Sequence, residues 1–134
     1  MIVTGLYVAL MALMSLFLAL RVVSRRKHAR VGLGHGGDEE LSRRQRAHAN
    51  MLEYVPLALL LLLVLELDHT APWLLHLFGI TLVVARVLHA WGLSHSSGTS
   101  FGRLFGTLFT WLVMLAMIAL LLWQQAVAWL MTAS

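Results

Sequence analysis

The most informative stretch of the chain is RAHANMLEYVPLALLLLLVL, residues 46–65. It begins with polar side chains at helical spacing, because Arg46, Asn50 and Glu53 stand at positions i, i+4 and i+7. Residues at this spacing fall on one face of a helix. After Glu53 the stretch continues without a charge to its end. It therefore predicts a helix whose polar stripe lies at one end of a segment suited to hydrocarbon.

The overall composition excludes several classes of protein. Of the 134 residues, 60% are hydrophobic and 12% are charged, whereas soluble domains hold about 45–50% apolar and about 25% charged residues. So little polar surface argues against a soluble enzyme domain, a disordered chain and a nucleic-acid-binding domain. The chain has no cysteine. Disulfides, thiolate metal sites and a cysteine nucleophile are thereby excluded, and any thiol must come from a ligand.

Positive charge is concentrated in one segment. The formal net charge is +4, and eight of the ten Lys and Arg residues lie between Arg21 and Arg46. A basic cluster beside apolar runs is typical of a cytoplasmic flank that contacts lipid headgroups. We therefore expect membrane lipid, and no nucleic acid, among the partners of this chain.

Apolar runs long enough to cross a bilayer recur along the chain. A hydrocarbon core of about 30 Å requires roughly 20 helical residues, and the run from residue 2 to residue 20 contains no charge. It lacks the basic start and small-residue exit of a signal peptide, so we expect an uncleaved span. The runs are Leu-rich and show none of the alternation of β-barrel strands. We predict an all-α integral membrane four-helix bundle, formed as one domain by residues 1–134. Its spans are predicted at residues 2–23, 42–67, 71–93 and 103–130.

The loop between the first two spans contains four glycines within residues 32–37 and three acidic residues at 38–40. No Lys-Ser/Thr pair follows the glycines, which favours a turn over a phosphate-binding loop. Acidic residues favour a helix N-terminus, and Ser42 with Gln45 has the spacing of a capping box. We expect the second helix to begin between Asp38 and Ser42.

The distribution of basic residues also predicts an orientation. The first loop is strongly basic, so the positive-inside rule places it in the cytoplasm and both termini outside. Glu66 and Asp68 then fall at the outer membrane face, where we expect them to be solvated. The start of the second helix, the end of the third and the start of the fourth meet on the cytoplasmic side.

A second pair of polar residues lies in the third span, where Arg86 and His89 are three residues apart and share a helix face. One interpretation is structural, with Glu53 forming a salt bridge to Arg86 or Arg46 across the bundle. The other is functional, because ionisable residues within membranes are costly and often mark sites. Haem ligation by His48 and His89 is conceivable in a bundle, but the spacing does not favour it, and we expect no metal.

The stretch RAHANMLEYVP at 46–56 resembles the signature of the MAPEG family, the membrane-associated proteins in eicosanoid and glutathione metabolism. The family pattern is R-A-x-x-N-x-x-E-[YN]-x-P near the start of the second helix. The stretch ARVLHAWG at 85–92 is similar to the family pattern A-R-x-x-x-x-x-G on the third helix. The chain matches the first pattern at Arg46, Ala47, Asn50, Glu53, Tyr54 and Pro56.

This resemblance implies a homotrimer of four-helix subunits in a bacterial inner membrane, with glutathione bound in cytoplasm-facing clefts between subunits. It implies that Arg103, at the start of the fourth helix, stabilises the glutathione thiolate. The chain departs from several glutathione-using members, because His89 and Leu93 stand where those members carry tyrosines. The residues implied to hold glutathione are Arg26, Arg46, Asn50, Glu53 and Tyr54, and we add Arg86 and His89 from the third span.

The chemistry of glutathione agrees with this set of residues. Arginine forks bind carboxylates, Glu53 can receive the ammonium group, and a nearby guanidinium favours thiolate over thiol. The thiolate would attack a lipophilic electrophile arriving from the bilayer. We therefore expect a glutathione-dependent transferase or peroxidase. One alternative is a protein that keeps the MAPEG scaffold without glutathione chemistry. A small four-span transporter is a weaker one, because the first span lacks the carboxylate that such exporters typically use.

Overall fold

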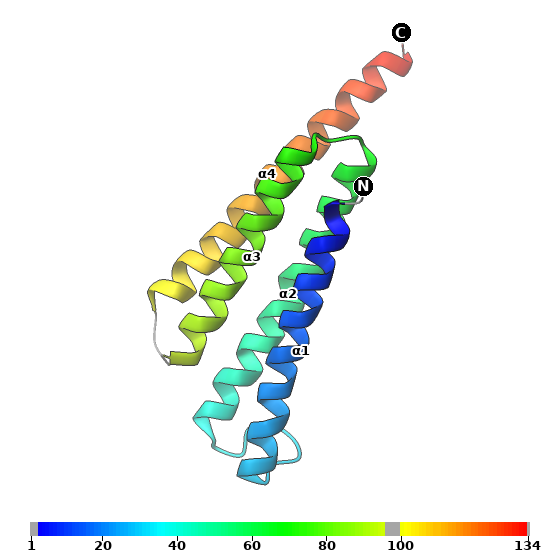
Figure 1. The fold of residues 1–134 in the computed structure, drawn as a ribbon. Helices are drawn as coiled ribbons and strands as arrows, with labels where there is room; N and C mark the ends of the chain where they lie inside the picture. The colour runs from blue at the N-terminus through cyan, green and yellow to red at the C-terminus, as the bar shows by residue number, and fades with distance from the viewer. Residues whose placement is uncertain (1–2, 96–99, 134) are drawn as a thin grey trace.

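The computed structural model describes residues 3–95 and 100–133, and over these residues it consists of four α-helices (Figure 1). Each helix is long and apolar enough to cross a membrane. The predicted all-α class and the four candidate spans are therefore confirmed, while the structure is that of a single chain. The helices are α1 (Val3–Ala29), α2 (Glu39–Leu67), α3 (Pro72–His95) and α4 (Phe101–Ala133).

The helices form an elongated bundle in which α2 and α3 occupy the centre. Helix α1 packs against α2 and α3, and α4 packs against α3 and α2. Within residues 3–95 and 100–133, α1 and α4 do not contact each other. The C-terminal end of α4 projects beyond the other three helices (Figure 1). Large apolar side chains of α1 and α4, such as Leu13 and Leu115, stay exposed, as expected of surfaces that face hydrocarbon rather than water.

Small residues allow α3 and α4 to approach closely. A Cβ atom added to Gly102 would lie 2.6 Å from the carbonyl oxygen of Leu88, and one added to Gly106 would lie 2.7 Å from that of Ala85. Such contacts are typical of membrane helices, where backbones approach through small residues because no hydrophobic effect drives association. A Cβ atom on Gly106 would also lie 2.7 Å from Cβ of His89. The close packing therefore places His89 directly against α4.

The N-terminal end of α1 and the C-terminal end of α2 are joined by a carboxylate. Glu66 accepts hydrogen bonds from the backbone N–H groups of Val3 and Thr4, the latter at 2.8 Å. A carboxylate at a helix N-terminus satisfies unpaired donors and interacts favourably with the helix dipole. The prediction that Glu66 is simply solvated is therefore wrong. Asp68 is partly exposed and accepts a hydrogen bond from Gln125 of α4.

Helix α2 begins where the sequence predicts, but a different residue caps its N-terminus. Asp38 is the N-cap residue, and its side chain accepts a hydrogen bond from the Leu41 N–H at 2.8 Å. The proposed capping box is wrong, because Ser42 and Gln45 already lie inside the helix. Gln45 instead donates to the carbonyl oxygen of Gly34 at 3.0 Å. The glycine loop thus folds back onto α2 as an ordered turn.

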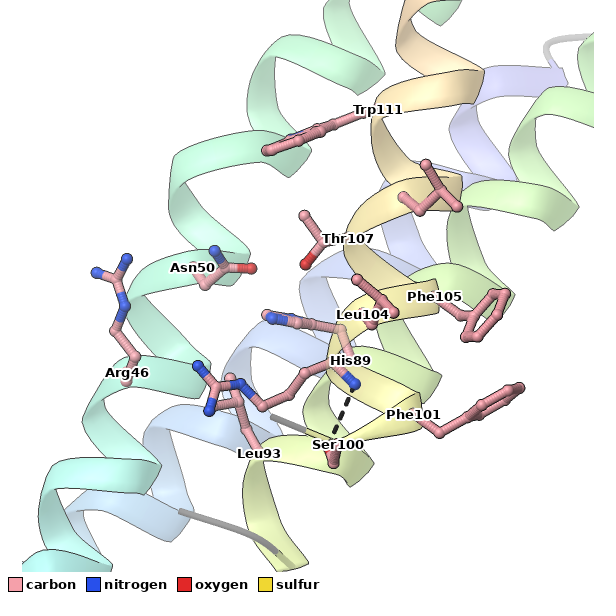
Figure 2. A pocket seen from close by; sticks show the side chains of 12 residues that line it. Arg46, Asn50, His89, Leu93, Ser100, Phe101, Leu104, Phe105, Thr107 and Trp111 are labelled. Atoms are coloured by element: carbon pink, nitrogen blue, oxygen red, sulfur yellow. Dashed lines mark hydrogen bonds between the residues drawn. The ribbon is translucent and has the colours of Figure 1, made fainter. Parts of the chain in front are cut away.

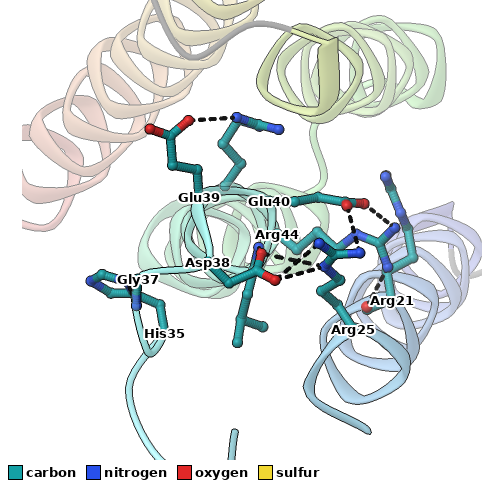
Figure 3. A network of polar contacts seen from close by, with 10 residues as sticks. Arg21, Arg25, His35, Gly37, Asp38, Glu39, Glu40 and Arg44 are labelled. Atoms are coloured by element: carbon teal, nitrogen blue, oxygen red, sulfur yellow. Dashed lines mark hydrogen bonds and ion pairs between the residues drawn. The ribbon is translucent and has the colours of Figure 1, made fainter. Parts of the chain in front are cut away.

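Ion pairs tie the start of α2 to the end of α1 (Figure 3). Arg25 lies 2.9 Å from Asp38 and 3.0 Å from Glu40. Arg44 pairs with the same Glu40 and donates to the backbone carbonyl of Arg21 at 2.8 Å. Because each carboxylate bridges two helices, this network holds the basic ends of α1 and α2 together.

The N-cap makes stability dependent on acid pH. The Leu41 N–H, and then the Arg25 guanidinium, hold the pKa of the Asp38 carboxyl below its ordinary value of 3.8. The stabilisation is therefore fully present above the pKa of the unfolded chain and is lost as pH falls through the lower folded pKa. We expect the unfolding temperature to fall between about pH 5 and about pH 2, and less steeply in Asp38→Ala. Thermal unfolding in detergent measures this.

The matched control for that experiment is Glu39→Ala, since the Glu39 side chain is 85% exposed. This variant is expected to keep the slope of the wild-type protein. An Asp38→Ala curve parallel to that of the wild-type protein would contradict the assignment of the acid dependence to Asp38.

Candidate functional site

A cavity of about 710 Å³ lies between α2, α3 and α4 and opens to the surface of the chain (Figure 2). This volume is in the range of small-molecule sites, about 300–1,000 Å³. Trp111 lies at one end of the cavity, and Arg46 and Ser100 lie toward the other (Figure 2). Its polar lining residues are Arg46, Asn50, His89, Ser100, Arg103 and Thr107, and its apolar ones are Leu93, Phe101, Leu104, Phe105, Leu108 and Trp111.

The polar stripe of α2 supplies one wall of the pocket. Arg46 Nη1 donates to Glu53 Oε1 at 3.1 Å, and Asn50 Nδ2 donates to Glu53 Oε2 at 3.3 Å. The predicted shared face of these three residues is confirmed. Glu53 pairs with Arg46 along its own helix rather than across the bundle. The side chains of Arg46 and Glu53 are 61% and 43% exposed, so this ion pair is weak and can exchange partners with a ligand.

Arg86 of α3 supports this wall from the buried interior of the bundle. Only 1% of Arg86 is exposed, and its Nη2 donates to Asn50 Oδ1 at 2.8 Å. A buried guanidinium is costly unless its donors find acceptors. The Asn50 amide therefore has both ends engaged, since its oxygen accepts from Arg86 and its nitrogen donates to Glu53. Arg86 orients the pocket wall through Asn50, and its own side chain does not line the pocket.

His89 contributes an imidazole from α3. It is 5% exposed and lines the pocket, and its Nδ1 atom makes no hydrogen bond to the part of the chain that the structure describes. Buried polar atoms are normally paired. A ring nitrogen in this position is a candidate partner for a polar group of a ligand.

Arg103 enters the pocket from the first turn of α4. Its backbone N–H donates to Ser100 Oγ at 3.4 Å, and the Leu104 N–H donates to the Ser100 carbonyl at 3.0 Å. Ser100 thus caps α4 in the manner of a Ser N-cap. The cap sets where the helix starts, and with it the turn on which Arg103 stands.

Four of the eight predicted site residues do not line the pocket, and within the described part of the chain two of these, Arg26 and Tyr54, also make no hydrogen bond to a residue that does. Arg26 Nη1 donates to the carbonyl oxygens of Gly32 and Gly34, both at 3.1 Å, so this guanidinium holds the glycine loop. Tyr54 is half-buried on α2, next to Glu53 but outside the lining. The structure therefore brings four of the eight predicted residues into one cavity, and Glu53 and Arg86 each stand one hydrogen bond away.

The apolar wall on α4 was not predicted from the sequence. Leu104, Leu108 and Trp111 stand at i, i+4 and i+7 and form one stripe facing the pocket. This spacing is visible in the sequence, but apolar side chains stand on most faces of α4, so their spacing alone gives no reason to choose that stripe. Ser100 was also missed, although a serine just before a long apolar run is a common N-cap signal.

The donor set of the pocket suits anions better than metal ions. Among residues 3–95 and 100–133, no group of three or more His, Asp or Glu side chains could hold a metal ion. Two guanidinium groups, one imidazole and one amide instead surround a cavity with an apolar wall. Such a set can bind carboxylates and stabilise a negatively charged sulfur or oxygen atom.

Fold and site together define an all-α membrane-type protein with a polar pocket at one end of its spans. The model of the MAPEG family matches residues 4–123, and the chain belongs to this family. It is similar to the Inner membrane protein YecN of Escherichia coli strain K12, and to the protein of the same name from Escherichia coli O6:H1 strain CFT073. Each is 35% identical over 128 residues, which is 92% of this chain and 92% of the relative. The predicted family is confirmed.

The pairing of Arg86 with Asn50 predicts a specific pattern of stability. Asn50→Leu leaves a buried guanidinium without its acceptor, so we expect the free energy of unfolding to fall by about 3–5 kcal/mol. Because replacing both partners by apolar groups removes the unpaired charge, Asn50→Leu with Arg86→Met is expected to recover much of this loss. Denaturant titration in detergent measures both, with Arg86→Met alone as the control. A double variant as unstable as the sum of the single variants would contradict the pairing.

Proposed function

We propose that the pocket between α2, α3 and α4 binds glutathione, and that the protein is a glutathione-dependent transferase or peroxidase acting on lipophilic electrophiles. One observation carries this proposal. Arg46, Asn50, His89 and Arg103, which come from three different helices, line one cavity whose remaining wall is apolar. Membership of the MAPEG family adds support, because many members use glutathione, although family alone does not establish an activity.

The charges of the site are complementary to those of glutathione. The tripeptide carries two carboxylates and one ammonium group. Arg46 and Glu53 already form an exposed ion pair, so a carboxylate can take the place of Glu53 on Arg46 while the ammonium group takes the place of Arg46 on Glu53. Asn50 is held in a fixed orientation by Arg86 and offers a rigid amide edge to the peptide.

Arg103 is assigned the stabilisation of the thiolate. It lines the same pocket from α4, opposite the α2 stripe, and a guanidinium beside the sulfur favours loss of the thiol proton. The thiolate sulfur attacks an electrophilic carbon, forms a thioether and displaces the leaving group with its bonding electrons. With a hydroperoxide, two glutathione molecules are oxidised to the disulfide while the hydroperoxide is reduced to an alcohol and water.

The apolar wall defines the route of the second substrate. Leu104, Leu108 and Trp111 are exposed on α4 and line the pocket at the same time. A hydrophobic small molecule dissolved in the bilayer can therefore reach the sulfur without passing through water. We place the protein in a bacterial inner membrane as a single domain over residues 1–134, with both termini outside and the pocket on the cytoplasmic side, in keeping with the basic first loop.

We further propose a homotrimer in which each pocket is closed by a neighbouring subunit. The pocket is open to the surface, and the side chains of Arg46 and Glu53 are 61% and 43% exposed. Arg26 of the same chain is engaged with the glycine loop. In the assembly, Arg26 of an adjacent copy would approach the exposed side and add a further positive charge for the tripeptide.

The second candidate is a MAPEG protein that keeps the scaffold without glutathione chemistry. Two observations favour it. His89 and Leu93 line the pocket where glutathione-using members carry tyrosines, and the charges of Arg46 and Glu53 satisfy each other in the absence of a ligand. Glutathione binding separates the two candidates.

The first test is ligand-dependent stability. Millimolar reduced glutathione is expected to raise the unfolding temperature of the purified protein, because a ligand at 100 times its Kd stabilises by about 2.7 kcal/mol. Arg46→Ala and Glu53→Ala are expected to abolish the shift. Arg43→Ala is the matched control, since Arg43 precedes Arg46 by one turn and pairs with Glu39 outside the pocket. A shift of equal size in all variants, or none in the wild-type protein, would favour the scaffold candidate.

The second test separates binding from chemistry. At saturating glutathione, Arg103→Ala is expected to lower the rate of conjugation of an aromatic electrophile about 100-fold or more, because a preorganised charge at the reacting atom is lost. Arg103→Lys is expected to recover part of the rate, and both variants keep the glutathione-dependent thermal shift. Unchanged conjugation in Arg103→Ala would mean that another group stabilises the thiolate.

A further inference from the structure

The imidazole of His89 is buried in the pocket wall with one of its nitrogen atoms unpaired. The residue belongs to α3, is 5% exposed and lines the pocket. Its Nδ1 atom is completely enclosed and forms no hydrogen bond within residues 3–95 and 100–133. Because buried polar atoms are normally paired, a ring held in this state beside a cavity points to a partner that comes from a ligand.

The burial of Nδ1 determines which nitrogen of the ring reaches the cavity. A neutral imidazole has one N–H donor and one bare nitrogen that accepts. A buried N–H group without an acceptor is rarer in proteins than an unpaired acceptor, which favours a proton on Nε2 and none on Nδ1. Since Nδ1 is enclosed, Nε2 is the nitrogen that can meet a ligand. His89 therefore offers the cavity a hydrogen-bond donor.

The packing of α3 on α4 gives the depth of this donor in the pocket. A Cβ atom added to Gly106 would lie 2.7 Å from Cβ of His89, so the two residues stand at the same level. Arg103 precedes Gly106 by three residues, a rise of about 4.5 Å. In Figure 2, His89 lies between Ser100 and Trp111. The donor thus stands about one helical turn beyond the start of α4, toward the apolar end of the pocket.

This order along the pocket suits a displacement at oxygen. The glutathione sulfur is proposed to lie at Arg103, and the lipophilic substrate is proposed to arrive along the apolar wall of α4. In a displacement the nucleophile attacks on one side of the reacting atom and the leaving atom departs on the other, in line. With the sulfur at the Arg103 end, the leaving atom departs toward the level of His89.

We infer that His89 is a catalytic residue that donates a hydrogen bond from Nε2 to the leaving oxygen of an organic hydroperoxide. This inference rests on the glutathione chemistry proposed above and names hydroperoxides as the preferred class of second substrate. A donor fixed where negative charge develops stabilises the transition state. An oxygen leaving atom gains most from it, because an alkoxide is a far less stable anion than a halide.

The electrons and protons of this step balance. The thiolate sulfur forms a bond to the terminal oxygen, the O–O bond breaks, and its electrons pass to the oxygen that is bonded to carbon. The sulfur is oxidised to a sulfenic acid, and the alkoxide is held by the His89 N–H. The alkoxide takes a proton from water, in place of the proton that the thiol released. A second glutathione converts the sulfenic acid to the disulfide and water.

Two substrates with different leaving atoms test this role. Cumene hydroperoxide releases an alkoxide, whereas para-nitrobenzyl chloride releases chloride. At saturating glutathione, His89→Phe is expected to lower the ratio of the peroxidase rate to the conjugation rate about 100-fold, because one preorganised donor is lost. Thr107→Val, which removes a hydroxyl group from the same cavity, is the matched control and is expected to keep the ratio. An equal loss of both rates in His89→Phe would overturn the inference, because a residue that only holds glutathione affects both reactions.

The identity of the donating nitrogen is tested separately. His89→Gln places an amide N–H at about the reach of Nε2 and is expected to recover part of the ratio, whereas the shorter side chain of His89→Asn is not. Nitrogen NMR spectroscopy of the purified wild-type protein in detergent is expected to show the ring proton on Nε2. A proton on Nδ1 alone would overturn the inference.

The wild-type protein distinguishes failure of this inference from failure of the proposed function. Conjugation of para-nitrobenzyl chloride without reduction of cumene hydroperoxide would overturn the inference and leave the glutathione function standing. Absence of both activities would overturn both.

Discussion

The pocket of this protein depends on the pairing of one buried guanidinium with one amide. Arg86 lies in the third span, where an unpaired charge is costly, and it finds its acceptor on Asn50 of the neighbouring helix at 2.8 Å. The amide nitrogen of Asn50 then turns toward Glu53, and Glu53 in turn engages Arg46. Because the buried guanidinium of Arg86 needs an acceptor, its pairing with Asn50 determines how the exposed side chains of Glu53 and Arg46 are oriented.

Close packing of α3 and α4 provides the second wall of the pocket, beside this series of hydrogen-bonded side chains. Gly102 and Gly106 allow the two backbones to approach so closely that a Cβ atom at either position would not fit. His89 is therefore held against α4, and Arg103, on the first turn of α4, lines the same cavity. Because α1 takes no part in this wall, the pocket is formed by residues of α2, α3 and α4.

The sequence was sufficient for the fold and for half of the site. Uncharged runs and helical spacing predicted four helices and the common face of Arg46, Asn50 and Glu53, because these depend on local periodicity. The cap at Asp38 and the role of Glu66 were not predicted correctly. Each depends on which of several nearby polar groups meets a helix end, and Glu66 meets residues more than sixty positions away. The pocket wall on α4 was not predicted, because apolar side chains stand on most faces of this helix and their spacing does not show which of them face the pocket.

The contact between Glu66 and the start of α1 has a consequence for assembly in the membrane. The two groups stand at the N-terminal end of α1 and the C-terminal end of α2, and Glu66 is synthesised only after both spans are almost complete. The first turn of α1 therefore cannot make these hydrogen bonds while α1 is alone in the bilayer. Whatever the order of insertion, this end of the α1–α2 hairpin becomes locked only when both spans are present.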